Sequence, residues 1–179
     1  MNHQAGLSLD NINNLSVSEA QQWFSHCCAA PKWFEAMAKA RPFTDIGQVK
    51  QVAQELWLQC TKQDLLTAFE AHPMIGDVSS LRKKYAATKD IASNEQQGAT
   101  QASEQTLQSL ADANHKYLAK HGFIFIICAT GLSADTMLNA LMQRINNTTD
   151  TEIQLAAAEQ IKITLLRLEK GLEKGIQTT

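Results

Sequence analysis

The chain has 179 residues, with 16 lysines and arginines against 18 aspartates and glutamates and a net charge of -2. This length suits one domain, residues 1–179, with a hydrophobic core of its own. The basic residues are scattered, which excludes the basic patch that a nucleic-acid-binding protein needs. The 8 glycines and 3 prolines are about half of what average usage gives, which argues against turn-rich all-β folds and favours long helices.

Nothing in the sequence indicates a membrane segment. The longest apolar run, residues 123–129, is too short to cross a bilayer, and residues 1–14 are polar and lack the regions of a signal peptide. We expect residues 1–14 to be loosely ordered. The cysteines fit no zinc-ligand spacing, and an adjacent pair makes a poor disulfide framework; they are Cys27, Cys28, Cys60 and Cys128. Free thiols in a reducing, cytoplasmic compartment are therefore predicted.

Four helices are predicted in the first part of the chain, at 16–29, 32–40, 46–60 and 61–72. Two of them open with a capping box, in which a hydroxyl and a carboxylate three positions apart satisfy backbone N–H groups. The pairs are Ser16 with Glu19 and Thr61 with Asp64. Pro31 suits the first position of the second helix, because its missing N–H has no helical partner there.

Four further helices are predicted in the rest of the chain, at 81–87, 104–120, 133–145 and 149–174. The polar stretch 92–102 is expected to be a loop, and long polar loops tend to carry function. Residues 123–129 have strand propensity, but no second β-rich segment exists to pair with them, so we predict a buried helix there. The expected fold is all-α, a single compact domain of roughly eight helices.

Most common catalytic motifs are missing from the sequence. It contains no phosphate loop, no dinucleotide-binding glycine pattern, no Gly-x-Ser-x-Gly and no His-Glu-x-x-His. No two histidines are three or four positions apart, so no helix offers a metal site. His72 is distinctive, because it ends a predicted helix and precedes Pro73. From the residues alone, a role in capping that helix is favoured over catalysis.

Simple structural roles are also open to Glu95, Gln96 and Arg167. Ser93 and Gln96 have the spacing of a capping box, so for Glu95 and Gln96 a helix-capping role and a functional role remain equally open. Arg167 lies beside the apolar stripe of the last helix, where a surface ion pair is the simplest role.

A wider pattern runs from about residue 16 to residue 172. Its motifs are Arg41-Pro42-Phe43, His72-Pro73-Met74-Ile75-Gly76, Glu95-Gln96-Gln97-Gly98, Asn114-x-x-Tyr117, Lys120-x-Gly122-Phe123-x-Phe125 and Lys162-Ile163-x-x-x-Arg167-Leu168. In this order, the series closely resembles the OHCU decarboxylase family. Its most specific parts are the His-Pro-x-Ile-Gly and Glu-Gln elements.

The resemblance implies an all-helical homodimer that uses no metal and no organic cofactor. Such enzymes convert 2-oxo-4-hydroxy-4-carboxy-5-ureidoimidazoline to (S)-allantoin in urate breakdown. The ring C=N of this substrate lies next to the carbon that bears the carboxylate. The ring can therefore accept the electrons that carbon dioxide leaves behind, a task for which other decarboxylases use a cofactor.

The resemblance also implies roles for single residues. His72 would be the general acid-base, and Glu95 would bind the ring and ureido nitrogens and help to move protons. Gln96 would bind the ring amide, and Arg167 would bind a carboxylate or carbonyl oxygen through its planar fork. The implied pocket lining consists of Pro73, Ser93, Phe125, Ile126 and Ile127.

One position departs from the family pattern. The family commonly has a serine three residues before the glutamate, where this chain has Ala92, with Ser93 one position later. The departure leaves open an enzyme of the same scaffold that acts on a related ureido or hydantoin substrate. A catalytically inactive helical interaction module of a purine-catabolic assembly is the alternative from another class.

Overall fold

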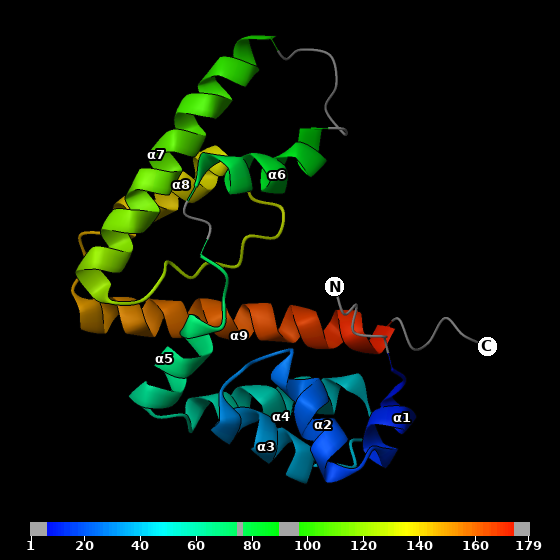
Figure 1. Ribbon diagram of the computed structural model, residues 1–179. Helices are drawn as coiled ribbons and strands as arrows, with labels where there is room; N and C mark the ends of the chain where they lie inside the picture. Colours follow the sequence, from blue (N-terminus) through cyan, green and yellow to red (C-terminus); the bar gives the residue numbers. More distant parts are fainter. Residues whose placement is uncertain (1–6, 75–76, 90–96, 174–179) are drawn as a thin grey trace. The chain divides into compact units, whose positions relative to one another are not determined.

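The structure is a computed structural model that describes residues 7–74, 77–89 and 97–173. Within these ranges it contains helices and no strand, which confirms the all-α prediction (Figure 1). The helices are α1 (Leu9–Asn14), α2 (Val17–Ser25), α3 (Pro31–Lys39), α4 (Ile46–Leu58), α5 (Lys62–Glu70), α6 (Val78–Lys89), α7 (Gln97–His121), α8 (Ala134–Arg144) and α9 (Thr149–Glu173). None of the described helices combines the length and the apolar character that crossing a membrane requires.

The described residues form two compact units. Unit 1 comprises the chain up to Ala71 and again from Ala157, and unit 2 is His72–Ala156.

Local capping chemistry explains where several helices begin. Both predicted capping boxes form, with the side chains of Ser16 and Thr61 each accepting from the third helical N–H. Pro31 occupies the start of α3, as predicted. Ser133 caps α8 by accepting from the N–H of Thr136. These contacts satisfy N–H groups that have no partner within their helix.

Four differences from the sequence prediction exceed two residues. Part of the segment expected to be loosely ordered forms α1, which Ser8 caps and whose Ile12 is buried. Helix α2 ends at Ser25, short of the predicted residue 29, and α6 is longer than the predicted 81–87. Helix α7 begins at Gln97, so the second half of the predicted polar loop is helical. The sequences of α1 and of the first turns of α7 contain few apolar residues, so the spacing of apolar residues could not indicate a helix there.

Three tryptophans anchor the core of unit 1. Trp33 and Trp57 are buried, and their indole N–H groups donate to the carbonyls of Ala53 and Ala157, each over 3.0 Å. The ring of Trp23 packs so closely on α9 that a Cβ placed on Gly171 would lie 2.8 Å from it. Each indole thus combines a large buried surface with a satisfied polar group or a close backbone contact.

Arg41 joins the ends of two helices of unit 1. Its Nη1 donates to the carbonyls of Ile12 and Leu15 over 2.7 and 2.8 Å, and its Nε donates to the carbonyl of Ala38 over 2.8 Å. The carbonyls at a helix C-terminus lack helical partners, and a cation there also complements the helix dipole. Arg41 therefore stabilises the C-terminal ends of α1 and α3.

In unit 2, α6 and α8 pack against the long helix α7 (Figure 1). Arg82 of α6 and Glu104 of α7 make a bidentate ion pair, with two N–O distances of 2.7 Å. Gly122 directly follows α7 with φ 78°, a left-handed conformation that glycine adopts without strain.

The predicted buried helix at residues 123–129 is wrong, because residues 124–129 adopt neither helix nor strand. The apolar side chains are buried as expected, among them Phe123, Phe125 and Ile126. The backbone argument for a helix fails because a side chain from another element satisfies a carbonyl of the segment. Arg144 Nη1 donates to the carbonyl of Ile126 over 2.8 Å.

Candidate functional site

His72 lies directly after the end of α5. The helix ends at Glu70, and the N–H of its C-cap residue, Ala71, donates to the carbonyl of Phe69. His72 follows as the first residue of unit 2 and is partly exposed, and Pro73 is exposed. The prediction of an imidazole at a helix C-terminus is therefore confirmed. Pro73 restricts the backbone directly after His72, and the side chain keeps access to solvent. An acid-base group needs both a defined position and this access.

The other catalytic candidate and two of its neighbours lie outside the described residues. They are Glu95, Ser93 and Gln96, within the range 90–96. Their proposed roles therefore stay predictions.

Arg167 lies on the part of α9 that belongs to unit 1. Its Nη1 donates to the backbone carbonyl of Cys27 over 3.2 Å. The predicted ion pair with a carboxylate is therefore replaced, in the described part of the chain, by a hydrogen bond to a carbonyl. The remaining guanidinium nitrogens leave Arg167 with further donor capacity. Arg167 belongs to unit 1, whereas His72 and the segment 125–127 belong to unit 2.

The thiol of Cys27 is not a candidate nucleophile. Its side chain is buried, and burial raises the pKa of this thiol to about 12, although the Arg167 guanidinium opposes the rise. Burial likewise raises the pKa of the Cys28 thiol to about 11. Only a thiolate attacks efficiently, and neither thiol ionises at neutral pH. The structure identifies all four cysteines of the chain as free thiols.

The three predicted lining residues of the 123–129 segment lie together in unit 2. Phe125 and Ile126 are buried, and Ile127 is partly exposed. Tyr117 packs edge-on against Phe125 with 5.3 Å between ring centroids, and the Arg144 guanidinium lies 4.6 Å above the same ring. A cation over an aromatic face is an attractive arrangement that strengthens in a dry environment.

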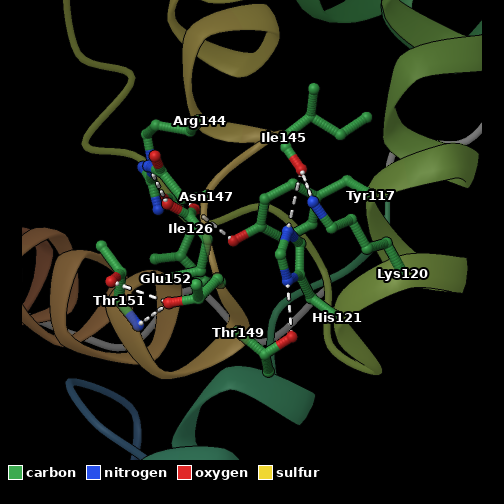
Figure 2. Close-up of polar contacts among 11 residues, drawn as sticks. Tyr117, Lys120, His121, Ile126, Arg144, Ile145, Asn147, Thr149, Thr151 and Glu152 are labelled. Carbon is green, nitrogen blue, oxygen red and sulfur yellow. Dashed lines mark hydrogen bonds and ion pairs between the residues drawn. The ribbon is translucent and has the colours of Figure 1, made fainter.

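A buried carboxylate organises the polar contacts next to this segment (Figure 2). The side chain of Glu152 is 0% exposed. Its Oε1 accepts from Tyr117 Oη over 2.6 Å and from Arg144 Nε over 2.9 Å, and its Oε2 accepts from Asn147 Nδ2 over 2.9 Å. We call Tyr117, Arg144, Asn147 and Glu152 the Glu152 cluster. The charge of Glu152 is paired with that of Arg144, and both of its carboxylate oxygens accept hydrogen bonds, as burial requires.

The tyrosine of this cluster acts as a permanent donor. Burial raises the pKa of Tyr117, and the hydrogen bond to Glu152 raises it further, so the phenol stays protonated. Arg144 Nη2 is also buried and has no hydrogen-bond partner among the described residues. Sequence analysis missed the Glu152 cluster, although Tyr117 belongs to the motifs that carry the family resemblance.

His121 is a structural histidine. It is buried, its Nε2 lies 3.2 Å from the carbonyl oxygen of Ile145, and its Nδ1 lies 2.9 Å from Thr149 Oγ1. Because a carbonyl only accepts, Nε2 carries the proton in this contact. Both ring nitrogens are thus occupied, which leaves His121 unsuited to an acid-base role.

Comparison with known proteins agrees with the sequence resemblance. The family model described as OHCU decarboxylase matches residues 13–169. The chain is 37% identical over 145 residues to the uric acid degradation bifunctional protein TTL of Arabidopsis thaliana, covering 80% of this chain and 44% of that protein. It is 25% identical to the 2-oxo-4-hydroxy-4-carboxy-5-ureidoimidazoline decarboxylase of Xenopus laevis, covering 90% of this chain and 93% of the relative.

A solved structure supports the same assignment. A crystal structure of an OHCU decarboxylase in the presence of (S)-allantoin matches with a TM-score of 0.68 and 34% sequence identity, over 86% of this chain and 98% of that one. The chain spans less than half of the Arabidopsis bifunctional protein but nearly all of the Xenopus enzyme. From the matched range 13–169 and these relatives, the chain belongs to the OHCU decarboxylase family.

Proposed function

We propose that this protein decarboxylates 2-oxo-4-hydroxy-4-carboxy-5-ureidoimidazoline to (S)-allantoin in urate degradation. The observation that carries the proposal is the match over 98% of an OHCU decarboxylase whose crystal structure was obtained in the presence of (S)-allantoin. A single family model spans both units, which supports one functional domain over residues 1–179. The names of the relatives do not favour an inactive module or a different ureido substrate.

The chemistry requires acid-base groups more than a cofactor. The bond between the ring carbon and the carboxylate breaks, carbon dioxide leaves, and the electron pair forms a double bond to the neighbouring ring carbon while the nitrogen of the C=N takes up a proton. The hydroxyl group then loses its proton as the ring carbonyl forms, and a proton is delivered to one face of the neighbouring ring carbon. The protein must therefore position the substrate, remove one proton from oxygen, and deliver one to nitrogen and one to carbon.

The residue roles follow the sequence prediction. His72 is proposed as the general acid-base, supported by its place at the end of α5 and its partial exposure. Glu95 is proposed to bind the ureido nitrogens and move protons, and Gln96 to bind the ring amide. Arg167 is proposed to bind a carboxylate or carbonyl oxygen. The proposed lining comprises Pro73, Ser93, Phe125, Ile126 and Ile127.

A direct test generates the unstable intermediate from urate and follows the optical activity of the allantoin formed. We expect this protein to give (S)-allantoin faster than spontaneous decay gives the racemate. A rate and optical activity equal to spontaneous decay would refute the proposed function.

Chelation is expected to leave the activity unchanged, because the substrate ring itself accepts the electrons. The same assay is run after dialysis against EDTA, with an untreated sample as control. Activity that is lost in EDTA and restored by one divalent metal ion would contradict the cofactor-independent mechanism.

Replacing Arg167 with lysine is expected to lower kcat/KM by about tenfold to a hundredfold, because lysine keeps the charge but loses the planar fork that binds two acceptors. Stability should change by less than about 1 kcal/mol, because the replaced hydrogen bond lies near the surface. Steady-state kinetics and chemical unfolding measure the two effects. The matched control is Lys162→Arg on the same helix, whose ion pair with Glu159 is exposed. Wild-type kinetics from the Arg167 variant would reject its role.

We also propose a homodimer in the cytoplasm. Exposed apolar side chains support an interface between copies of the chain, with Leu58 85% and Met142 53% exposed. The free cysteines suit a reducing compartment. Sedimentation at micromolar concentration is expected to give the mass of two chains, and a monomer throughout the concentration range would contradict the dimer.

A further inference from the structure

The guanidinium of Arg144 joins the Glu152 cluster to the irregular segment at 124–129. Its Nε donates to Glu152 Oε1 over 2.9 Å, while its Nη1 donates to the Ile126 carbonyl over 2.8 Å (Figure 2). Its plane also lies over the ring of Phe125. Arg144 therefore contacts two consecutive residues of the segment, one through the backbone and one through the side chain.

The carboxylate fixes the direction in which this guanidinium points. Glu152 is fully buried and accepts from three side chains, so neither of its oxygens is free to turn. Arg144 ends α8 and Glu152 lies in the first turn of α9, where the helix dipoles favour a cation and an anion, respectively. The pair therefore sits at a place where both charges are stabilised by the helices that carry them.

The segment itself depends on such a contact. It has neither helical nor sheet hydrogen bonding to set its path, and a buried carbonyl without a partner would be unfavourable. The contact from Arg144 meets this need at Ile126, the central residue of the three proposed to line the substrate pocket. The Ile126 carbonyl belongs to the peptide plane that joins Ile126 to Ile127, so this contact sets the orientation of that plane. The guanidinium over the Phe125 ring restrains the preceding residue.

We propose that Arg144 is a positioning residue for the reaction. Directed by Glu152, it fixes the backbone of residues 125–127 in the place that substrate binding requires. This inference rests on the proposed function, since it assigns a role to the lining segment of that same site. Displacing catalytic contacts by about 1 Å can cost a hundredfold in rate, so a residue outside the substrate's reach can have a large kinetic effect.

Arginine and lysine should differ sharply at this position. In Arg144→Met the charge is lost and Glu152 is left without its cation, so both stability and activity should fall. In Arg144→Lys one ammonium can still pair with Glu152 but lacks the fork that reaches Ile126 at the same time. Lysine is therefore expected to restore most of the stability and little of the activity.

The experiment compares wild type, Arg144→Met and Arg144→Lys at a temperature where circular dichroism shows each to be folded. We expect kcat/KM of Arg144→Lys to be about tenfold to a hundredfold below wild type, mainly through kcat. Amide hydrogen exchange should be about tenfold faster at residues 124–128 and unchanged in α9. Full recovery of kcat by lysine, or unchanged exchange in the segment, would overturn the proposal.

A control variant separates positioning from general stability. Lys120→Met removes another contact from a cation to a carbonyl, at Ile145, without touching the 124–129 segment. It should keep kcat within about twofold of wild type. A fall in kcat in this control equal to that in Arg144→Lys would reduce Arg144 to a stabilising residue.

Failure of the proposed function is distinguishable from failure of this inference. If wild type does not accelerate decarboxylation, the proposed function is wrong and the kinetic role of Arg144 is refuted with it. If wild type is active and Arg144→Lys is equally active, only the inference is overturned. The exchange measurement decides in either case whether Arg144 fixes the segment.

Discussion

The His72→Asn variant is expected to lower kcat by roughly two to four orders of magnitude, the range that general acid-base catalysis contributes. The amide of asparagine can still hydrogen-bond near the end of α5, but it cannot accept and release a proton near neutral pH. The fold should persist, because His72 lies beyond the last turn of the helix and is partly exposed. Rates of (S)-allantoin formation and the helical signal in circular dichroism measure the two effects.

The chain supplies a matched control for this variant. His26 is the C-cap residue of α2 and is exposed, so it also stands at a helix C-terminus. His26→Asn makes the same chemical change at a residue with no proposed role in the reaction and should leave kcat unchanged. Near-normal turnover in His72→Asn, or equal losses in the two variants, would transfer the acid-base role to another residue.

The Glu152→Gln variant is expected to lose about 3–5 kcal/mol of unfolding free energy, since it leaves the buried charge of Arg144 without its partner. The amide also presents hydrogen atoms where Asn147 or Tyr117 donates, so one of the present contacts must break. Urea unfolding followed by circular dichroism gives the free-energy difference.

An exposed ion pair in the same unit provides the comparison. The Arg82–Glu104 pair is about half exposed on both sides, and Glu104→Gln should cost under about 1 kcal/mol. Adding Arg144→Met to Glu152→Gln removes the unpaired charge and should recover part of the loss. Equal effects at Glu152 and Glu104, or no recovery in the double variant, would show that burial does not govern the strength of this pair.

Signals that act over a few residues made much of the fold predictable. Ser16, Thr61 and Ser133 begin helices as their hydroxyls indicate, and Pro31 occupies a first turn. These features depend on side chains and backbone groups within one turn of each other. The sequence therefore contains them in a form that can be recognised without knowledge of tertiary contacts.

The segment at 123–129 was mispredicted because its decisive contact is distant in the chain. The carbonyl of Ile126 is satisfied by Arg144, 18 positions later. The contact between Tyr117 and Glu152 spans 35 positions. Propensity and periodicity cannot detect such pairs, since they describe only neighbours within an element.

The candidate site was predictable to a similar degree. The position of His72 at a helix end follows from the apolar pattern of α5 and the proline after it. Its assignment to catalysis depended on the family resemblance, because the residues alone favoured capping. The hydrogen bond of Arg167 to the carbonyl of Cys27 joins residues 140 positions apart, and neither spacing nor charge indicated it.

The close packing of Trp23 on Gly171 limits how this protein can be engineered for heat resistance. Exchanging a helical glycine for alanine usually adds up to about 1 kcal/mol, which makes Gly171 of α9 an attractive target by sequence. Here the new methyl group would lie 2.8 Å from a buried indole ring. Since the indole has little room to move, alanine would raise the helix propensity but would overpack the core around Trp23. A thermostability library should therefore leave Gly171 unchanged.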